Sequence, residues 1–191
     1  MQKFTLAIIG ILCISFFMSC TPSTIPQKTQ TALNTVCTIQ LFEYGTEKIY
    51  KQLFGRLDEI EQLMSVTIPS SEIAHINKAA GDFPVKVSKD TFNVIETSLS
   101  FAEESSSAFN PAMGPLVSLW NITGFNPLED SIPSSQKIQD SLSKTDYTKI
   151  ILNKDAETVF LQEEGMALDL GGIAKGWAAD ELMIILEENK I

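Results

Sequence analysis

The stretch LDLGGIAKGWAAD, residues 168–180, is the most informative part of the sequence because it holds three glycines, one lysine and two aspartates. The apolar run MALDL (166–170) leads into it and predicts a buried strand. Apolar residues three and four positions apart predict a helix over 173–188. The glycines therefore lie at a predicted strand-to-helix turn, where bare backbone serves either a close ligand or a tight change of direction.

The groups at this turn are suited to binding an anion. Gly171 and Gly172 can expose backbone N–H groups at the positive end of the predicted helix. Lys175 would add a point charge, and Asp169 would accept a hydrogen bond from a ligand or approach a metal. The pattern is neither a Walker A loop nor a clean G-x-G-x-x-G. A phosphate-binding loop and a ligand-free turn with a salt-bridged lysine therefore both stay open.

The rest of the chain alternates strands and helices without a regular βαβ period, which predicts an α+β domain. Residues 121–146 are rich in Asn, Pro, Asp and Ser and predict a long surface excursion. Period-two runs predict strands over 33–43, 84–88, 149–153 and 158–162, the last two as a hairpin. Helical periodicity and capping residues predict helices over 46–64, from Glu72 to about 77, over 89–105 with Ser88 as N-cap, and over 134–143.

Composition and charge exclude several classes of function. The chain has 191 residues, 44% hydrophobic and 20% charged, as expected for a globular protein. Its formal net charge of −10 repels phosphate backbones, so we expect no nucleic-acid partner. His75 is the only histidine, so we expect neither a histidine-based zinc site nor a Ser-His-Asp triad within this chain.

The N-terminus has the features of an export signal. A basic start, MQK, precedes the apolar core LAIIGILCISFF, which predicts a signal peptide over 1–19. Cys20 follows directly and opens a polar, proline-containing stretch, so we expect a lipidated Cys20 and a tether over 20–32. An ordinary cleaved signal with an incidental cysteine is the alternative. Only Cys37 then remains in the folded part, which predicts no intramolecular disulfide.

Two further segments combine glycine, proline and aromatic residues. SSSAFNPAMGPLVSLW (105–120) predicts a loop in which Phe109 and Trp120 either line a pocket for a flat ring or pack into the core. MSVTIPSSEIAHIN (64–77) predicts a capped helix with a solvated His75.

Together these segments resemble the ApbE-like family of FAD:protein FMN transferases, over about 34–190. The family pattern runs M-G-T, then S-x-Y-x-P-x-S-E-[LI]-x-x-[LF]-N, then G-A-F-[DN]-P-T-[VM]-G-P-L, then D-L-G-[GA]-[IV]-A-K-G-[YW]-A-x-D. The corresponding residues here are 33–35, 65–77, 108–116 and 169–180. The last motif matches almost residue for residue. The resemblance implies a T-fold-like mixed sheet with packed helices, formed by 33–191 as the N-terminal part of the domain.

The resemblance also implies a set of binding residues. Asp169 and Lys175 would contact the flavin nucleotide, and the carbonyl of Gly172 would be one Mg²⁺ ligand. The remaining FAD contacts would come from Ala108, Phe109 and Asn110, and from Leu33 and Thr67. Leu33 replaces the leading methionine of the pattern and Thr67 replaces its aromatic residue, so those two contacts are expected to differ.

The implied activity is transfer of FMN from FAD to a threonine of a membrane redox subunit, with Mg²⁺ and release of AMP. The expected location is the bacterial inner membrane, where the lipid anchor holds the protein on the periplasmic side. Two alternatives are Mg²⁺-dependent hydrolysis of FAD to FMN and AMP, and flavin binding without catalysis.

The length of the sequence adds an expectation of truncation at the C-terminus. In the family a metal-binding D-x-x-x-[TSA] motif follows further along the chain, and we expect its counterpart to lie beyond Ile191. One carbonyl cannot hold Mg²⁺, which takes about six oxygen ligands. We therefore expect no Mg²⁺-dependent turnover by this chain alone. We also expect an uncovered apolar stripe on the last helix, made by Ala174, Ala178, Leu182 and Ile185.

Overall fold

The computed structural model describes residues 27–121 and 132–191. The predicted signal peptide (1–19) and the lipidation site Cys20 lie outside the described residues. None of the helices in the described part is long and apolar enough to cross a bilayer. The elements confirm an α+β fold: β1 (Gln27–Ala32), β2 (Thr35–Gln40), α2 (Glu47–Met64), α3 (Glu72–Lys78), β3 (Val85–Lys86), α4 (Lys89–Glu104), α5 (Gly114–Trp120), α6 (Ser135–Leu142), η1 (Tyr147–Lys149), β4 (Ile150–Asn153), β5 (Thr158–Leu161) and α7 (Ala174–Glu188).

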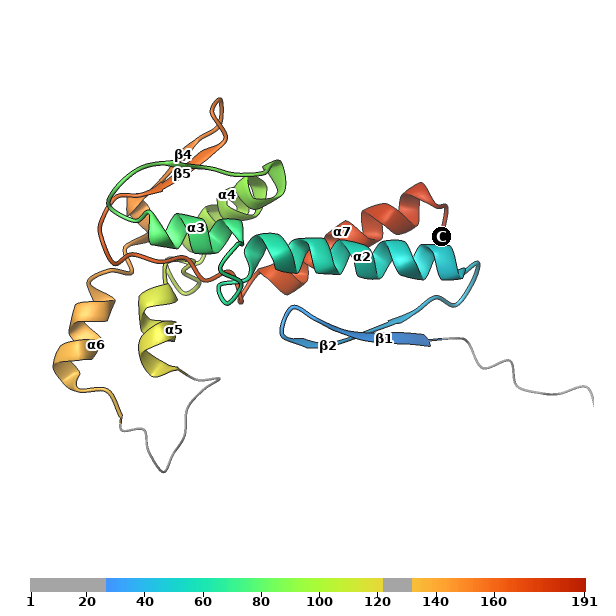
Figure 1. The fold of residues 1–191 in the computed structure, drawn as a ribbon, viewed down its shortest axis with the longest axis horizontal. Helices are drawn as coiled ribbons and strands as arrows, with labels where there is room; N and C mark the ends of the chain where they lie inside the picture. The colour runs from blue at the N-terminus through green and yellow to red at the C-terminus, as the bar shows by residue number, and fades with distance from the viewer. Residues whose placement is uncertain (1–26, 122–131) are drawn as a thin grey trace, which may run out of the picture.

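Helices α2 and α7 lie side by side in the half of the molecule that also holds the β1–β2 hairpin (Figure 1). Thr46 caps α2, because its hydroxyl accepts a hydrogen bond from the backbone N–H of Ile49. Leu53 and Ile60 are fully buried on the inner face of α2. The amphipathic pattern predicted for 46–64 is confirmed, and this helix forms one wall of the core.

The predicted exposure of the α7 stripe is wrong. Ala178 is 1% exposed and Ala174 is 9% exposed, and both belong to the core cluster that also contains the α2 side chains. Small alanines let two helices approach closely, so α2 itself covers this face of α7. The exposed apolar side chains of α7 are instead Met183 (54%) and Ile184 (49%).

The strand predicted over 33–43 is shorter and belongs to a hairpin. β1 and β2 pair antiparallel, with Ala32 opposite Thr35. The two turn residues, Leu33 and Asn34, have φ angles of 53° and 56°, as in a type I′ turn. The polar sequence of residues 27–32 predicts a tether, and this is wrong for that segment. It forms a strand, because one face of the hairpin packs toward α2 while the polar face stays in solvent.

A second sheet has the order β3-β5-β4 and is antiparallel throughout. The predicted hairpin over 149–162 is confirmed as β4 and β5. The strand predicted over 166–170 is wrong, although Met166, Leu168 and Leu170 are buried as expected. Their backbone is bonded to a side chain and to loop residues, so the segment is extended without being part of a sheet.

Residues 105–120, predicted as a loop, contain a seven-residue helix, α5. Gly114 and Pro115 are residues typical of loops, so the sequence does not predict this helix. Proline is nevertheless well tolerated in the first turn of a helix, where its missing N–H would have no partner within the helix. Trp120 ends this helix and is 40% exposed, so it is not a core residue. The helix predicted over 134–143 is confirmed as α6.

Arg56 forms ion pairs that join α2 to α4 and to α7. Arg56 on α2 contacts Asp90 of α4 at 2.6 Å and Glu181 of α7 at 2.7 Å. Burial alone would lower the pKa of the guanidinium, but hydrogen bonds with Glu181 and Asp90 outweigh it and the net shift is upward. The arginine side chain is 16% exposed, so this charge is held largely out of water between three helices.

Candidate functional site

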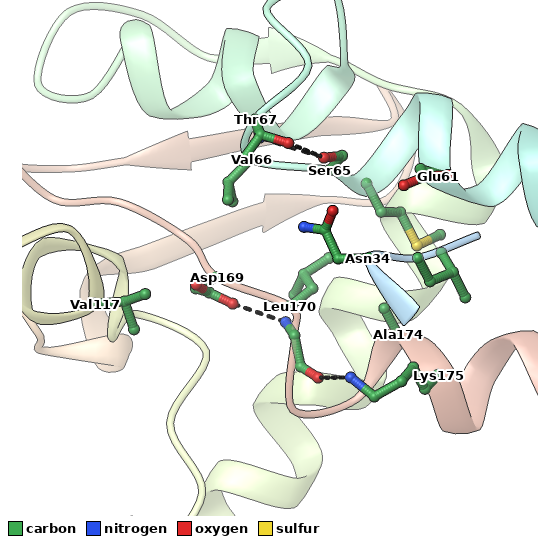
Figure 2. Close-up of a pocket in the computed structure, with 13 residues that line it drawn as sticks. Asn34, Glu61, Ser65, Val66, Thr67, Val117, Asp169, Leu170, Ala174 and Lys175 are labelled. Carbon is green, nitrogen blue, oxygen red and sulfur yellow. Dashed lines mark hydrogen bonds between the residues drawn. The ribbon is translucent and has the colours of Figure 1, made fainter. Parts of the chain in front are cut away.

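A pocket of about 250 Å³ opens beside the start of α7, and we call it the Lys175 pocket (Figure 2). It is formed by the β1–β2 turn, the end of α2, the loop before α3, one residue of α5 and the loop into α7. Its lining residues are Leu33, Asn34, Glu61, Met64, Ser65, Val66, Thr67, Val117, Asp169, Leu170, Gly171, Ala174 and Lys175. Four predicted FAD contacts, at positions 33, 67, 169 and 175, therefore meet in one cavity.

Asp169 and Lys175 are both bonded to the peptide groups of Gly171. The Asp169 Oδ1 accepts a hydrogen bond from Gly171 N at 2.8 Å, and the Lys175 Nζ donates to Gly171 O at 3.0 Å. A Cβ on residue 171 would lie 2.9 Å from the Asp169 oxygen, so a larger residue here would displace this carboxylate from its bond to Gly171 N. The loop predicted from the sequence is thus a compact turn with a cation on its rim, as Figure 2 shows.

The start of α7 has no side-chain cap, and the backbone N–H groups of Ile173 and Ala174 both donate to the carbonyl of Leu170, at 2.9 and 2.8 Å. The N-cap residue is Ile173, whose side chain cannot cap, so the first helical N–H groups receive no side-chain acceptor. An anion at this position would gain from the helix dipole and from Lys175. These are the groups with which the loop could hold a phosphate.

Side chains from distant segments hold the loop in place. Asn77, at the end of α3, accepts a hydrogen bond from Leu168 N at 2.7 Å and donates to Leu168 O at 3.0 Å. The backbone carbonyl of Pro111 accepts from Asp169 N at 2.9 Å. These bonds replace the strand pairing that the sequence predicts, and they fix the direction of the Asp169 side chain. The sequence motif that ends at Asn77 gives no sign of this role as a backbone clamp.

A second pocket, of about 390 Å³, lies between α4 and α7, and we call it the Phe109 pocket. Its lining residues are Thr97, Phe101, Ser105, Phe109, Gly172, Ile173, Gly176, Trp177 and Asp180. A Cβ on Gly172 would lie 3.1 Å from the Phe109 ring, so the ring packs directly against the glycine backbone. Two predicted site residues, Phe109 and Gly172, therefore lie on this side of the loop.

Ala108 and Asn110 line neither of these two pockets. Ala108 is exposed. The Asn110 amide donates to the carbonyl of Thr145 at 2.8 Å, and its oxygen accepts from Ala112 N at 2.8 Å. Asn110 thus shapes the loop that carries Pro111.

The described residues do not make a complete site for Mg²⁺. The Gly172 carbonyl belongs to an exposed residue and could supply one oxygen ligand. Within residues 27–121 and 132–191, no group of three or more His, Cys, Asp or Glu side chains could hold a metal ion. Octahedral Mg²⁺ needs about six oxygen ligands, so further ligands are required beyond those that the structure places near Gly172.

Two polar residues of the Lys175 pocket escape prediction from the sequence. Glu61 follows Ile60 on α2, and Asn34 is the second residue of the hairpin turn. A helical pattern marks Glu61 only as a surface position, and the turn is hidden inside a predicted strand. Their place at the pocket depends on how the hairpin and α2 pack, which no local pattern reports.

Comparison with known proteins agrees with this geometry. Residues 33–191 match the ApbE family. A FAD:protein FMN transferase of Klebsiella pneumoniae is 38% identical over 145 residues, covering 76% of this chain and 45% of the relative. A protein of the same name from Treponema pallidum is 32% identical over 168 residues, covering 83% of this chain and 46% of the relative.

Solved structures show the same fold. The ApbE protein of Thermotoga maritima superposes with a TM-score of 0.78 at 29% identity, over 86% of this chain and 53% of that one. The flavin transferase ApbE of Vibrio cholerae gives a TM-score of 0.75 at 21% identity, over 85% and 54% of the two chains. The chain thus spans about half the length of the relatives it matches. With the family match extending from residue 33 to the last residue described, this protein belongs to the ApbE family.

Proposed function

We propose that this chain binds FAD in the Lys175 pocket and serves the transfer of its FMN moiety to a threonine of a membrane redox subunit, with release of AMP. The observation that carries the proposal is the convergence of Leu33, Thr67, Asp169 and Lys175 on one cavity. These residues are spread over the sequence, and the family resemblance assigns each of them to FAD from its motif alone. Relatives that bear the name FAD:protein FMN transferase support the same reaction.

The chain's own groups fit the binding of a dinucleotide. The pyrophosphate would lie at the rim made by Lys175 and the uncapped start of α7, where the helix dipole and positive charge stabilise it. Asp169 would accept a hydrogen bond from a ligand hydroxyl or ring N–H with the oxygen that does not bind Gly171. To receive the phosphate, Lys175 would leave the Gly171 carbonyl, which costs little because that bond is exposed to water.

Mg²⁺ is part of the proposal and would neutralise the charge that builds on the pyrophosphate oxygens as the bond breaks. Gly172 would contribute its carbonyl. The carboxylate or hydroxyl ligands that complete the site would come from outside the groups that the structure gathers here. We likewise propose that Cys20 is lipidated and holds the protein at the periplasmic face of the inner membrane, and Cys20→Ser would release it from the membrane fraction.

The experiment has two arms because the chain covers about half of its relatives. FAD titration of the chain alone tests the pocket, with Lys175→Ala as the paired variant. A chimera that adds the uncovered half of the Klebsiella relative is then incubated with FAD, Mg²⁺ and a threonine-bearing acceptor. Covalent flavin fluorescence on the acceptor in a denaturing gel is expected for the chimera and absent for its Lys175→Ala version.

Product analysis separates the alternatives. Free FMN and AMP without a labelled acceptor would indicate hydrolysis of FAD. Untouched FAD with a normal titration curve would indicate a flavin-binding protein without catalysis. Absence of FAD binding to the chain and to the chimera would overturn the proposed function.

A further inference from the structure

Glu61 is a charged group of the Lys175 pocket that the proposed function does not use. Its residue is half-buried in the last turn of α2. Throughout the part of the chain that the structure describes, no ion pair or hydrogen bond involves its carboxylate. The C-terminal end of a helix disfavours negative charge, and α2 has no basic residue in its last turn. Glu61 is therefore placed at an electrostatic cost that the fold does not offset.

Asn34 presents a second uncommitted polar group to the same pocket. It has a φ of 56°, a conformation that asparagine tolerates better than most residues. In the family pattern a glycine stands at this position, so the carboxamide is an addition of this chain. In the view of Figure 2, the Asn34 carboxamide lies between Asp169 and the Glu61 side chain. The turn and α2 thus supply two hydrogen-bonding groups across the pocket from the phosphate-binding rim.

We propose that Glu61 and Asn34 form the edge of the Lys175 pocket that recognises the hydroxyl and amine donors of the dinucleotide, as specificity-determining residues. This inference rests on the proposed function. A carboxylate repels phosphate, so Glu61 is suited to a part of the ligand that donates hydrogen bonds. Lys175 would hold the pyrophosphate while Glu61 and Asn34 fix which end of the molecule enters the pocket. A few well-placed polar groups in a mainly apolar cavity commonly set ligand orientation in this way.

FAD offers such donors at both ends. The adenosine half carries ribose hydroxyls and an exocyclic amine, and the riboflavin half carries ribityl hydroxyls and a ring N–H. Adenosine and riboflavin lack phosphate, so neither is affected by charge repulsion from Glu61. Competition by these two compounds therefore identifies the half that the edge recognises.

The experiment measures the dissociation constant of FAD for the chain and for Glu61→Ala, Glu61→Gln and Asn34→Gly. Loss of a hydrogen bond to a charged acceptor predicts a weakening of about ten- to a hundredfold for Glu61→Ala. Glu61→Gln keeps an acceptor, and Asn34→Gly loses only a neutral group while keeping the turn, so each should weaken binding by about two- to tenfold. Gln62→Ala, on the next and exposed position of α2, is the matched control and should bind as the parent chain does.

Thermal unfolding separates this role from a structural one. Removing an unpaired carboxylate from the end of α2 should leave the midpoint unchanged or raise it, while FAD affinity falls. Tighter or unchanged FAD binding by Glu61→Ala overturns the inference and leaves the proposed function intact. A parent chain that binds no FAD overturns both, which the titration of the unmutated protein reveals at once.

Discussion

The two pockets that flank the loop into α7 differ in chemistry although one short motif lines both. The Lys175 pocket holds two carboxylates, a lysine and an asparagine amide, and it meets an uncapped helix start. The Phe109 pocket is lined mainly by aromatic rings and by glycine backbone. Within the described residues, the buried indole N–H of Trp177 in this second pocket has no acceptor.

The difference teaches that a motif can combine binding and packing within a few residues. Asp169 and Lys175 face the Lys175 pocket, whereas Gly172 faces the Phe109 ring. The two glycines thus permit two different close approaches. Gly171 allows the carboxylate of Asp169 to approach its backbone, and Gly172 allows the Phe109 ring to pack against the loop. A sequence pattern alone treats both as signs of a ligand.

The largest effect should come from a change that weakens the packing of α7, because residues at the start of this helix line both pockets. Arg56→Met removes the charge that joins α7 to α2 and α4 and leaves Asp90 and Glu181 unpaired. We expect the free energy of unfolding to fall by about 2–4 kcal/mol, less than for a fully buried pair because both carboxylates are partly exposed. Urea unfolding measures this loss. Lys154→Met, which breaks only an exposed contact with Glu96, is the control and should change stability little.

The next effect should be confined to the Lys175 pocket. Asp169→Ala and Lys175→Ala remove a hydrogen-bond acceptor and a positive charge that face the proposed ligand. Each should weaken FAD binding by about ten- to a hundredfold, the equivalent of about 1.5–3 kcal/mol. Flavin fluorescence titration checks this, with circular dichroism to confirm the fold. If both variants titrate as the parent does, the loop is a ligand-free turn after all.

These two predictions depend on parts of the fold that the sequence predicts with unequal success. The sequence predicts α2 because Leu53, Leu57 and Ile60 repeat at helical spacing. It predicts a strand over 166–170 because buried strands and buried extended loops share one pattern. The two structures differ in the hydrogen-bond partner of the backbone. Here the partner of the Leu168 peptide groups is the side-chain amide of Asn77, 91 residues earlier in the chain, and no strand takes its place.

The residues of the candidate site can likewise be predicted from the sequence only in part. Asp169 and Lys175 can be recognised because their environment is local, a glycine turn at the start of a helix. Glu61 and Asn34 cannot, because their position at the pocket arises from hairpin packing against α2. The motif identifies Phe109, yet the structure places it on the opposite side of the loop from the Lys175 pocket. Which pocket a residue lines depends on how distant segments pack together, and the sequence does not give that information.

A smaller effect should be limited to the Phe109 side of the loop. Gly172→Ala would place a methyl group 3.1 Å from the Phe109 ring, which must shift by a few tenths of an ångström. Overpacking of this kind should cost about 1–2 kcal/mol of stability. Combining it with Phe109→Leu should recover part of the loss, because the smaller side chain makes room. A double-mutant cycle by urea unfolding measures this coupling, and strictly additive losses would contradict direct packing.

The smallest expected effect is that of Mg²⁺ on this chain by itself, which should be none. Gly172 offers one carbonyl, and the described residues bring no three acidic, histidine or cysteine side chains together elsewhere. Without a filled set of oxygen ligands the ion stays in solution and cannot neutralise charge on the pyrophosphate. The chain should therefore bind FAD equally with and without Mg²⁺ and release no AMP in either case.

Chromatographic assay for AMP checks this, with the chimera carrying the remaining half of the Klebsiella relative as the positive comparison. AMP release that depends on Mg²⁺, from the chain alone in a monodisperse sample, would show that these residues complete a metal site in solution. The Phe109 pocket, which Gly172 and Asp180 both line, would then have a role in metal binding as well as in packing.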